Sequence, residues 1–178
     1  MATEHDTAAD AFAAEHPIRC VVVTVSDTRT AATDTSGDLV ASRLTDGGYV
    51  VVDRHLVPDD PVIIDHLLQA LLLRADVDVI LTTGGTGIAR RDTTIEVVRR
   101  RLTTEIEGFG ELFRMVSWTE VGAAAMLSRA IGGLVVRPPT DGGDTFIFCM
   151  PGSRNACDTA MTKLLVPQLG HLVWERHR

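Results

Sequence analysis

Apolar runs of strand length alternate with amphipathic stretches of helix length through the first hundred residues of this chain. The apolar runs predict strands at 18–25, 50–57 and 77–81, and the amphipathic stretches predict helices at 35–46 and 62–74. This alternation predicts an α/β fold with three layers, in which a mostly parallel, doubly wound sheet has helices on both faces. Because ligands bind such sheets beyond the carboxyl ends of the strands, the turns there are the first candidates for a functional site.

A glycine-rich string, TTGGTGIARRD at 82–92, follows the third predicted strand and precedes a helix that starts after Asp92. Three glycines are expected at positive φ, where an anion could approach the main-chain N–H groups, and three threonines add hydroxyl donors. These residues are Gly84, Gly85, Gly87, Thr82, Thr83 and Thr86. The string lacks the lysine of a P-loop and the spacing of a dinucleotide fingerprint, so a plain tight turn is the alternative. Arg90 and Arg91 add charge beyond what a turn needs, although either could simply face solvent.

Two further turns are expected at the same edge of the sheet. Ser26, Asp27 and Thr28 follow the first predicted strand, and the PDD string at 58–60 follows the second. Since the carboxyl ends of parallel strands share one edge, these turns and the glycine loop are candidates for a common ligand-binding rim.

The second half of the chain has a different pattern. An alanine-rich helix is predicted at 121–130, and strands at 134–137 and 145–150 flank the turn PPTDGG, where they could pair. In PGSRNA, at 151–156, Ser153 is expected to cap a helix whose first N–H groups form a second candidate anion site. The alternative for Ser153 is a cap alone. An amphipathic helix closes the chain.

Composition argues against several classes of function. The 178 residues carry a net charge of −7, which disfavours a nucleic-acid binder. No apolar run approaches the roughly 18 residues of a membrane span. Three scattered cysteines without a CxxC pair predict reduced thiols in a cytoplasmic protein, with Cys149 and Cys157 as small core residues. We expect one domain at 18–178 behind a flexible acidic tail at 1–17.

Four strings in order, TTGGTGIARRDTT, GFGELFR, AAMLSRA and PGSRNA, resemble the MogA/MoaB family of molybdenum cofactor biosynthesis proteins. The resemblance covers residues 18–172, nearly the whole predicted domain. It implies a molybdopterin-binding α/β domain that, in active members, transfers AMP from ATP to the terminal phosphate of molybdopterin, with Mg²⁺, and releases pyrophosphate. It also implies self-association into trimers or pairs of trimers, and it allows a molybdenum insertion protein as a partner.

The same resemblance assigns roles to individual residues. Asp59 in LVPDD and Asp92 in RRD match the family's acidic pair and would bind the metal and catalyse transfer. Substrate contacts are implied for Ser26, Asp27, Thr28, Ser36, Gly37, Thr83, Gly84, Gly85, Thr86, Gly87, Glu111, Arg114, Ser117 (or Ser128), Pro151, Gly152 and Ser153. Joining two phosphates independently favours such groups, because backbone donors, arginines and Mg²⁺-binding carboxylates offset the repulsion between anions. The alternative is that Asp92 only caps a helix and Asp59 only shapes a turn.

Two features of the sequence leave a second function open. PGSRNA has Arg154 where many relatives have proline, and this side chain could contact an anion or face water. AAMLSRA and the EVG string at 120–122 resemble the MoaB branch, some of whose members bind without catalysing. The alternative function is therefore a non-catalytic molybdopterin-binding or scaffold protein of the same fold. The fold also occurs in molybdenum insertion enzymes and CinA-like proteins, which the lack of a further predicted domain disfavours.

Overall fold

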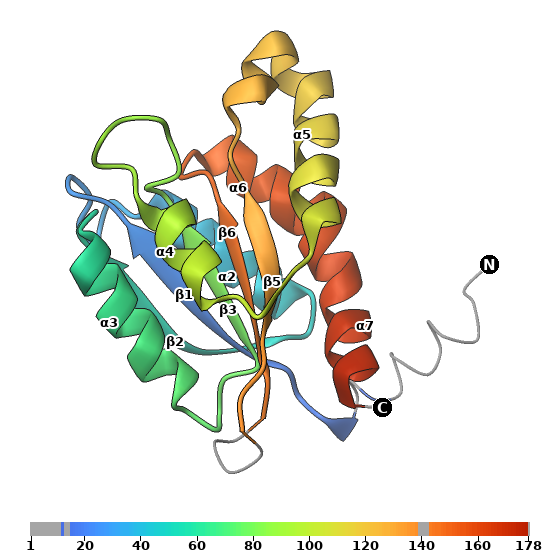
Figure 1. Cartoon of the computed structure of the whole chain (residues 1–178). Coiled ribbons are helices and arrows are strands. Elements are labelled where there is room, and N and C mark those ends of the chain that lie inside the picture. The colour runs from blue at the N-terminus through green and yellow to red at the C-terminus, as the bar shows by residue number, and fades with distance from the viewer. Residues whose placement is uncertain (1–11, 13–14, 139–142, 178) are drawn as a thin grey trace.

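The computed structural model describes residues 12, 15–138 and 143–177 (Figure 1). The tail expected at 1–17 and the PPTDGG turn therefore lie largely outside the described residues. Six strands form one sheet in the order β2-β1-β3-β6-β5-β4. Their bounds are β1 Arg19–Val25, β2 Val50–Val57, β3 Val79–Thr83, β4 Thr104–Glu105, β5 Ile131–Val135 and β6 Thr145–Met150. Strands β2, β1, β3 and β6 are parallel and β5 is antiparallel to both neighbours, which confirms the predicted mostly parallel sheet.

Helices cover both faces of this sheet. They are α2 Thr35–Asp46, α3 Pro61–Leu72, α4 Thr94–Arg101, α5 Glu107–Val121, α6 Arg154–Ala160 and α7 Val166–His177, with a 3-10 turn at Gly122–Leu127 and a π turn at Met161–Leu165. Helices α3 and α4 pack on one face, and α2, α5, α6 and α7 pack on the other (Figure 1). Alternate residues of β1 serve the two layers, with Val21 in the α3 and α4 core and Val22 in the other. The three predicted layers are confirmed.

Capping side chains set where the first two helices begin. The carboxylate of Asp34 accepts the N–H of Gly37 at the start of α2, which has its predicted bounds. The carboxylate of Asp60 accepts the N–H groups of Val62 and Ile63 at the start of α3. Pro61 occupies the first turn of α3, where its missing N–H costs nothing, so this helix begins one residue earlier than predicted.

The helical stretch predicted at 121–130 is confirmed only in part, since residues 122–127 form a 3-10 helix and not an α-helix. Helix α5 lies earlier, over the GFGELFR string, and it ends at Gly122, whose φ of 58° does not continue a right-handed helix. Phe109 and Phe113, one turn apart, are buried in the core, and this burial outweighs the weak helix propensity of the nearby glycines. The strand predicted at 134–137 begins earlier, at Ile131, and pairs with β6 as expected.

Candidate functional site at the rim of the sheet

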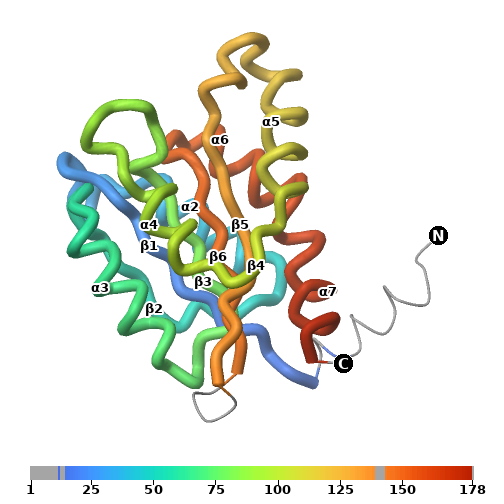
Figure 2. The backbone as a smooth tube through the Cα atoms, in the orientation of Figure 1, coloured from blue at the N-terminus to red at the C-terminus, as the bar shows by residue number. Residues whose placement is uncertain are grey.

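Four strand ends lie at one level of the sheet. Thr83 of β3 pairs with Thr24 of β1 and with Met150 of β6. At the end of β2, Val57 pairs with Val25 of β1. The backbone view in Figure 2 shows the loops that follow β1 and β3 at the same end of the sheet. The structure therefore brings the turns after β1, β2, β3 and β6 to one rim.

A hollow of about 160 Å³ opens on this rim. It is lined by the loops after β1, β2 and β3, through Val25, Ser26, Asp27, Thr28, Asp59, Gly85, Arg91 and Asp92. The space is many times the roughly 10 to 15 Å³ that one water molecule needs by the same measure, so it can admit a phosphate group. Three carboxylates and one guanidinium surround it, so a positive ion or a phosphate with its counterion suits the hollow better than an apolar ligand.

Two glycines shape the loop after β3. Gly84 has φ 97°, and a Cβ added there would lie 2.1 Å from the carbonyl oxygen of Val25. Gly85 has φ 61°, and its added Cβ would lie 2.1 Å from Oγ1 of Thr94 and 2.9 Å from both carboxylate oxygens of Asp59. Only glycine fits these positions. The prediction of positive φ at Gly87 is wrong. Five of the described glycines have positive φ, and Gly87 is not among them.

The Asp59 carboxyl lies directly against Gly85 and is half-buried. Its Oδ1 is enclosed and has no hydrogen-bond partner among the residues that the structure describes. Burial raises the pKa of Asp59, and the nearby negative charges of Asp92 and Asp27 raise the pKa further, against the opposing effects of the Thr93 N–H and Arg91. A partly buried carboxylate with a free oxygen and like charges around it is the arrangement that a bound cation relieves.

Asp92 does not form the helix cap that was considered as its alternative role. Thr93, not Asp92, is the residue before α4, and no side-chain cap is formed there. Asp92 instead accepts the N–H of Ala89 at 2.9 Å, inside the glycine loop. Asp60, not Asp59, caps α3. Both carboxylates thus lie beside the glycine loop, in the lining of the hollow.

The donor set fits a Mg²⁺ ion that is shared with substrate. Within the described part of the chain, no three His, Cys, Asp or Glu side chains are grouped closely enough to hold a metal alone. Magnesium in phosphate-binding sites commonly takes one or two protein carboxylates and completes its shell with phosphate oxygens and water. Asp59 and Asp92, which both line the hollow, can supply that share.

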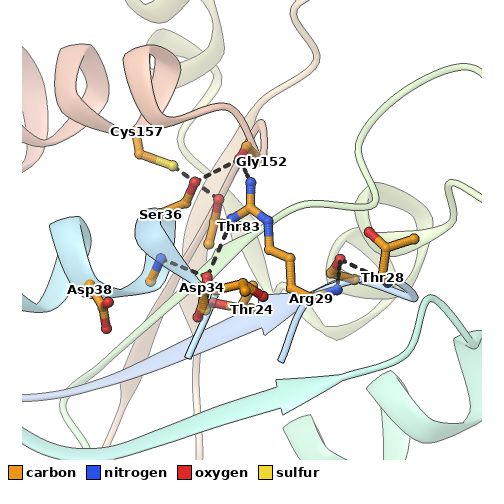
Figure 3. Close-up of polar contacts among 12 residues, drawn as sticks. Thr24, Thr28, Arg29, Asp34, Ser36, Asp38, Thr83, Gly152 and Cys157 are labelled. Atoms are coloured by element: carbon orange, nitrogen blue, oxygen red, sulfur yellow. Dashed lines mark hydrogen bonds and ion pairs between the residues drawn. The ribbon is translucent and has the colours of Figure 1, made fainter. Parts of the chain in front are cut away.

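A buried polar network lies next to the hollow (Figure 3). At its centre, Asp34 accepts a 2.6 Å hydrogen bond from Oγ1 of Thr24 and a 3.0 Å bond from the N–H of Gly37. The guanidinium of Arg29 lies 3.3 Å from the same carboxylate and donates to the carbonyl oxygen of Gly152 at 2.9 Å. Ser36 donates to that carbonyl as well, at 2.8 Å. This network joins the loop after β1, the start of α2 and the turn after β6.

Sequence reasoning did not find two of these residues, Arg29 and Asp34. Asp34 had a signal, since an aspartate directly before a predicted helix is a typical cap. Arg29 had none, because its acceptor Gly152 is 123 positions away in the chain. Ser36 and Gly37, expected to contact substrate, are buried within this network.

Glu111, Arg114 and Ser117 lie on α5 and are separated from the hollow. Ser117 is buried, whereas Glu111 and Arg114 are exposed. In Figure 1 this helix stands on the far side of α6 from the glycine loop. Among the described residues, neither Glu111 nor Arg114 bonds to the rim. The structure thus does not bring these three residues to the site within one copy of the chain.

The turn after β6 and the cysteines match their predictions from the sequence. Ser153 caps α6 by accepting the N–H of Ala156 at 3.2 Å, and Arg154 is exposed. All three cysteines are free and buried. Burial raises the pKa of the Cys149 thiol to about 12 and raises the pKa of Cys157. Both are therefore neutral core thiols at physiological pH.

A mostly parallel α/β sheet with a glycine loop and two carboxylates at its rim places this protein in the doubly wound class, whose ligands bind at this edge. Residues 21–171 match the family described as "Probable molybdopterin binding domain". The match covers most of the chain, which therefore belongs to this family, as the four ordered strings indicated.

Individual relatives place the chain with the MoaB proteins of that family. It is 50% identical over 162 residues to "Molybdenum cofactor biosynthesis protein B" of Bacillus anthracis, covering 90% of this chain and 92% of the relative. A crystal structure of a protein of that name superposes with a TM-score of 0.84 at 49% identity, covering 91% and 97% of the two chains. The "tungsten cofactor synthesizing protein MoaB" of Pyrococcus furiosus gives 0.80 at 33% identity, covering 92% and 99%.

In the described ranges, no helix is both long enough and apolar enough to cross a bilayer.

Proposed function

We propose that the chain is a molybdopterin adenylyltransferase, which transfers AMP from ATP to the terminal phosphate of molybdopterin and releases pyrophosphate. The observation that carries the proposal is the half-buried carboxyl of Asp59, which lies beside Gly85 and lines a hollow together with Asp92. Such a carboxyl suits the binding of a cation between phosphates. Membership of the molybdopterin-binding family supplies the second substrate.

The reaction joins two anions, so charge and position are its main requirements. An oxygen of the molybdopterin phosphate attacks the α-phosphorus of ATP, a new P–O bond forms, and the bond to the β-phosphate oxygen breaks to release pyrophosphate. Mg²⁺, when bound by Asp59 and Asp92, would neutralise charge on the reacting phosphates. The N–H groups of the glycine loop, and those of Gly152 and Ser153 in the turn that begins at Pro151, would hold phosphate oxygens.

Other rim residues have supporting roles in this proposal. Ser26 and Thr28 lie in the lining of the hollow, where their hydroxyl groups could contact phosphate oxygens. Asp27 positions the Asp59 main chain by accepting its N–H at 2.9 Å. Thr83 and Thr86 are buried within the glycine-rich string. A cytoplasmic location suits this chemistry, since all three thiols are free.

A second candidate function is binding of molybdopterin without catalysis, as a carrier or scaffold. It is favoured by the similarity of the chain to proteins named biosynthesis protein B, a name that states no reaction. A molybdenum insertion protein would then be the natural recipient of the bound pterin. The two functions share the site and differ in whether the aspartates support turnover.

Self-association is also part of the proposal. Six large apolar side chains on α5 and the turn after it are more than 45% exposed: Leu112, Met115, Trp118, Val121, Met126 and Leu127. Exposed apolar surface of this extent is typical of protein interfaces. A homotrimer or homohexamer that covers this surface could also bring Glu111 and Arg114 of one copy to the rim of another.

Product identification tests the proposed reaction. Purified protein is incubated anaerobically with molybdopterin, ATP and Mg²⁺, pyrophosphate is followed with time, and the pterin product is identified by its mass. Adenylylated molybdopterin formed in step with pyrophosphate supports the transferase. Saturable molybdopterin binding with neither product would instead support the carrier or scaffold.

A further inference from the structure

Two consecutive carbonyl groups in the turn after β6 each accept two side-chain hydrogen bonds. The carbonyl of Pro151 accepts from Oγ1 of Thr83 at 3.0 Å and from Sγ of Cys157 at 3.3 Å. The carbonyl of Gly152 accepts from Arg29 at 2.9 Å and from Ser36 at 2.8 Å. A turn of this length needs no such support to reverse the chain, so the orientation of its peptide groups is specifically fixed.

Arg29 is the charged member of this set, and its own position is fixed by Asp34. The side chain of Asp34 is only 5% exposed, and it is held by Thr24 and the start of α2. Its carboxylate lies 3.3 Å from one terminal nitrogen of Arg29, which leaves the other nitrogen to reach Gly152. Figure 3 shows the guanidinium between Asp34 and Gly152. A planar guanidinium can bridge two acceptors in this way, whereas an ammonium group cannot hold both in the same geometry.

The position of Gly152 affects the glycine loop directly. A Cβ added to Gly152 would lie 3.0 Å from Cα of Gly84, so the two turns are in close contact. The N–H of Gly84 also donates to the carbonyl of Met150 at 3.2 Å. In a trans peptide the C=O and the following N–H point in opposite directions. Arg29 therefore turns the N–H of exposed Ser153 away from the buried network.

We infer that Arg29 is a positioning residue for molybdopterin binding, which acts by holding the Gly152 carbonyl so that the Ser153 N–H and the glycine loop face the ligand together. The inference rests on the proposed use of this rim by molybdopterin. It assigns to Arg29 no contact with the reacting atoms, and it separates binding, which depends on Arg29, from AMP transfer, which depends on Asp59 and Asp92.

The test compares Arg29→Gln and Arg29→Lys with Arg43→Gln. Arg43 is a matched control, because this arginine of α2 forms a 2.8 Å ion pair with Asp158 of α6. The pair lies outside the turn after β6. Titration with molybdopterin under anaerobic conditions should give a Kd raised about tenfold by Arg29→Gln, the factor that loss of one charge-assisted hydrogen bond typically brings. Arg29→Lys should give an intermediate Kd. Arg43→Gln should stay within about twofold of wild type.

Thermal melts and turnover complete the test. All titrations are made well below the lowest Tm, so that every variant is folded. If turnover occurs, kcat of Arg29→Gln at saturating molybdopterin should stay within about threefold of wild type while KM rises with Kd. An unchanged Kd in Arg29→Gln, or an equal rise in Arg43→Gln, overturns the inference. Absence of wild-type turnover would contradict the transferase alone, because the Kd comparison does not depend on it.

Discussion

The main-chain N–H of Asp59 donates a 2.9 Å hydrogen bond to Oδ1 of Asp27. This bond joins the loop after β2 to the loop after β1 and fixes the Asp59 backbone beside the glycine loop. The other oxygen of Asp27 lies 3.9 Å from Nη1 of Arg91. Asp27 therefore acts on Asp59 in two ways, by holding its main chain and by adding negative charge that raises its pKa.

Substitutions at Asp27 should separate these two effects. Asp27→Asn keeps an oxygen acceptor for the Asp59 N–H and removes the charge, whereas Asp27→Ala removes both. We expect Asp27→Ala to lower kcat/KM for AMP transfer about tenfold, and Asp27→Asn to lower it about threefold or less. Both should lower the pKa of Asp59, as followed by carbon NMR of its carboxyl. Wild-type kcat/KM in Asp27→Ala would show that the hydrogen bond does not position Asp59.

Asp59→Asn should stabilise the fold at neutral pH. Because the pKa of Asp59 is raised in the folded chain, folding disfavours the ionised carboxyl. The stability that the protonated carboxyl contributes to the fold is fully present below the unfolded-state pKa of about 3.9. It is lost as pH rises through the folded-state pKa. We therefore expect a higher Tm than wild type at pH 7, and no difference near pH 3. Calorimetric scans across this pH range measure the effect.

Asp65→Asn is the matched control of opposite sign. Its hydrogen bond with Arg101 lowers the pKa of Asp65, so this carboxylate contributes stability above the unfolded-state pKa, and the contribution is lost as pH falls through the folded-state pKa. Asp65→Asn should lower the Tm at pH 7, with a smaller difference in acid. A decrease of similar size in Asp59→Asn at pH 7 would contradict the environment described for Asp59.

Gly85→Ala should lower the free energy of unfolding by more than the cost of positive φ alone. Gly48→Ala is the control, since Gly48 has φ 84° and an added Cβ there meets nothing within 4 Å. We expect Gly48→Ala to lower the free energy of unfolding by about 1 kcal/mol. Gly85→Ala should cost a further 1 to 3 kcal/mol, roughly, because its Cβ meets Thr94 and Asp59, and it should weaken molybdopterin binding. Urea denaturation provides the comparison, and equal losses would mean that the loop relaxes freely.

Trp118→Glu should dissociate the proposed oligomer. The side chain is 61% exposed on α5, and a carboxylate there would be costly to bury in an interface. Val62→Glu on α3 is the control, because Val62 is 59% exposed and lies on the other face of the sheet. Light scattering after gel filtration should give a trimeric or hexameric mass for wild type and Val62→Glu, and a lower mass for Trp118→Glu. A monomeric mass for wild type would contradict the proposed interface.

Elements with complete local signals were predictable from the sequence. Helix α2 and strand β2 have the predicted bounds. For α2, a capping aspartate, a regular apolar stripe and terminal glycines all indicate the same helix. Helix α5 was not predicted, because Gly108 and Gly110 weaken the helical signal of its sequence. Gly110 in fact lies inside the helix, where an added Cβ would approach the Ala130 carbonyl to 2.8 Å, so this glycine allows close packing.

The candidate site was predictable only in part, because some of its contacts use main-chain groups. The rule that ligands bind at the carboxyl ends of parallel strands located the rim turns, and the family resemblance selected Asp59 and Asp92 among many carboxylates. Arg29 could not be found, since its function depends on a carbonyl brought close by the β1, β3 and β6 pairing. Main-chain acceptors of this kind leave no residue-type signal in a sequence.

The most direct test of the proposed function measures AMP transfer by wild type, Asp59→Asn and Asp92→Asn at saturating ATP, Mg²⁺ and molybdopterin. We expect each substitution to lower kcat by a factor of about 10² to 10⁴, typical of losing an electrostatic group at a reacting phosphate, while the Kd for molybdopterin changes less than about tenfold. Higher Tm in Asp59→Asn would show that the loss is not unfolding. Turnover at the wild-type rate in both variants, or tight binding without turnover in wild type, would contradict the catalytic role of this carboxylate pair.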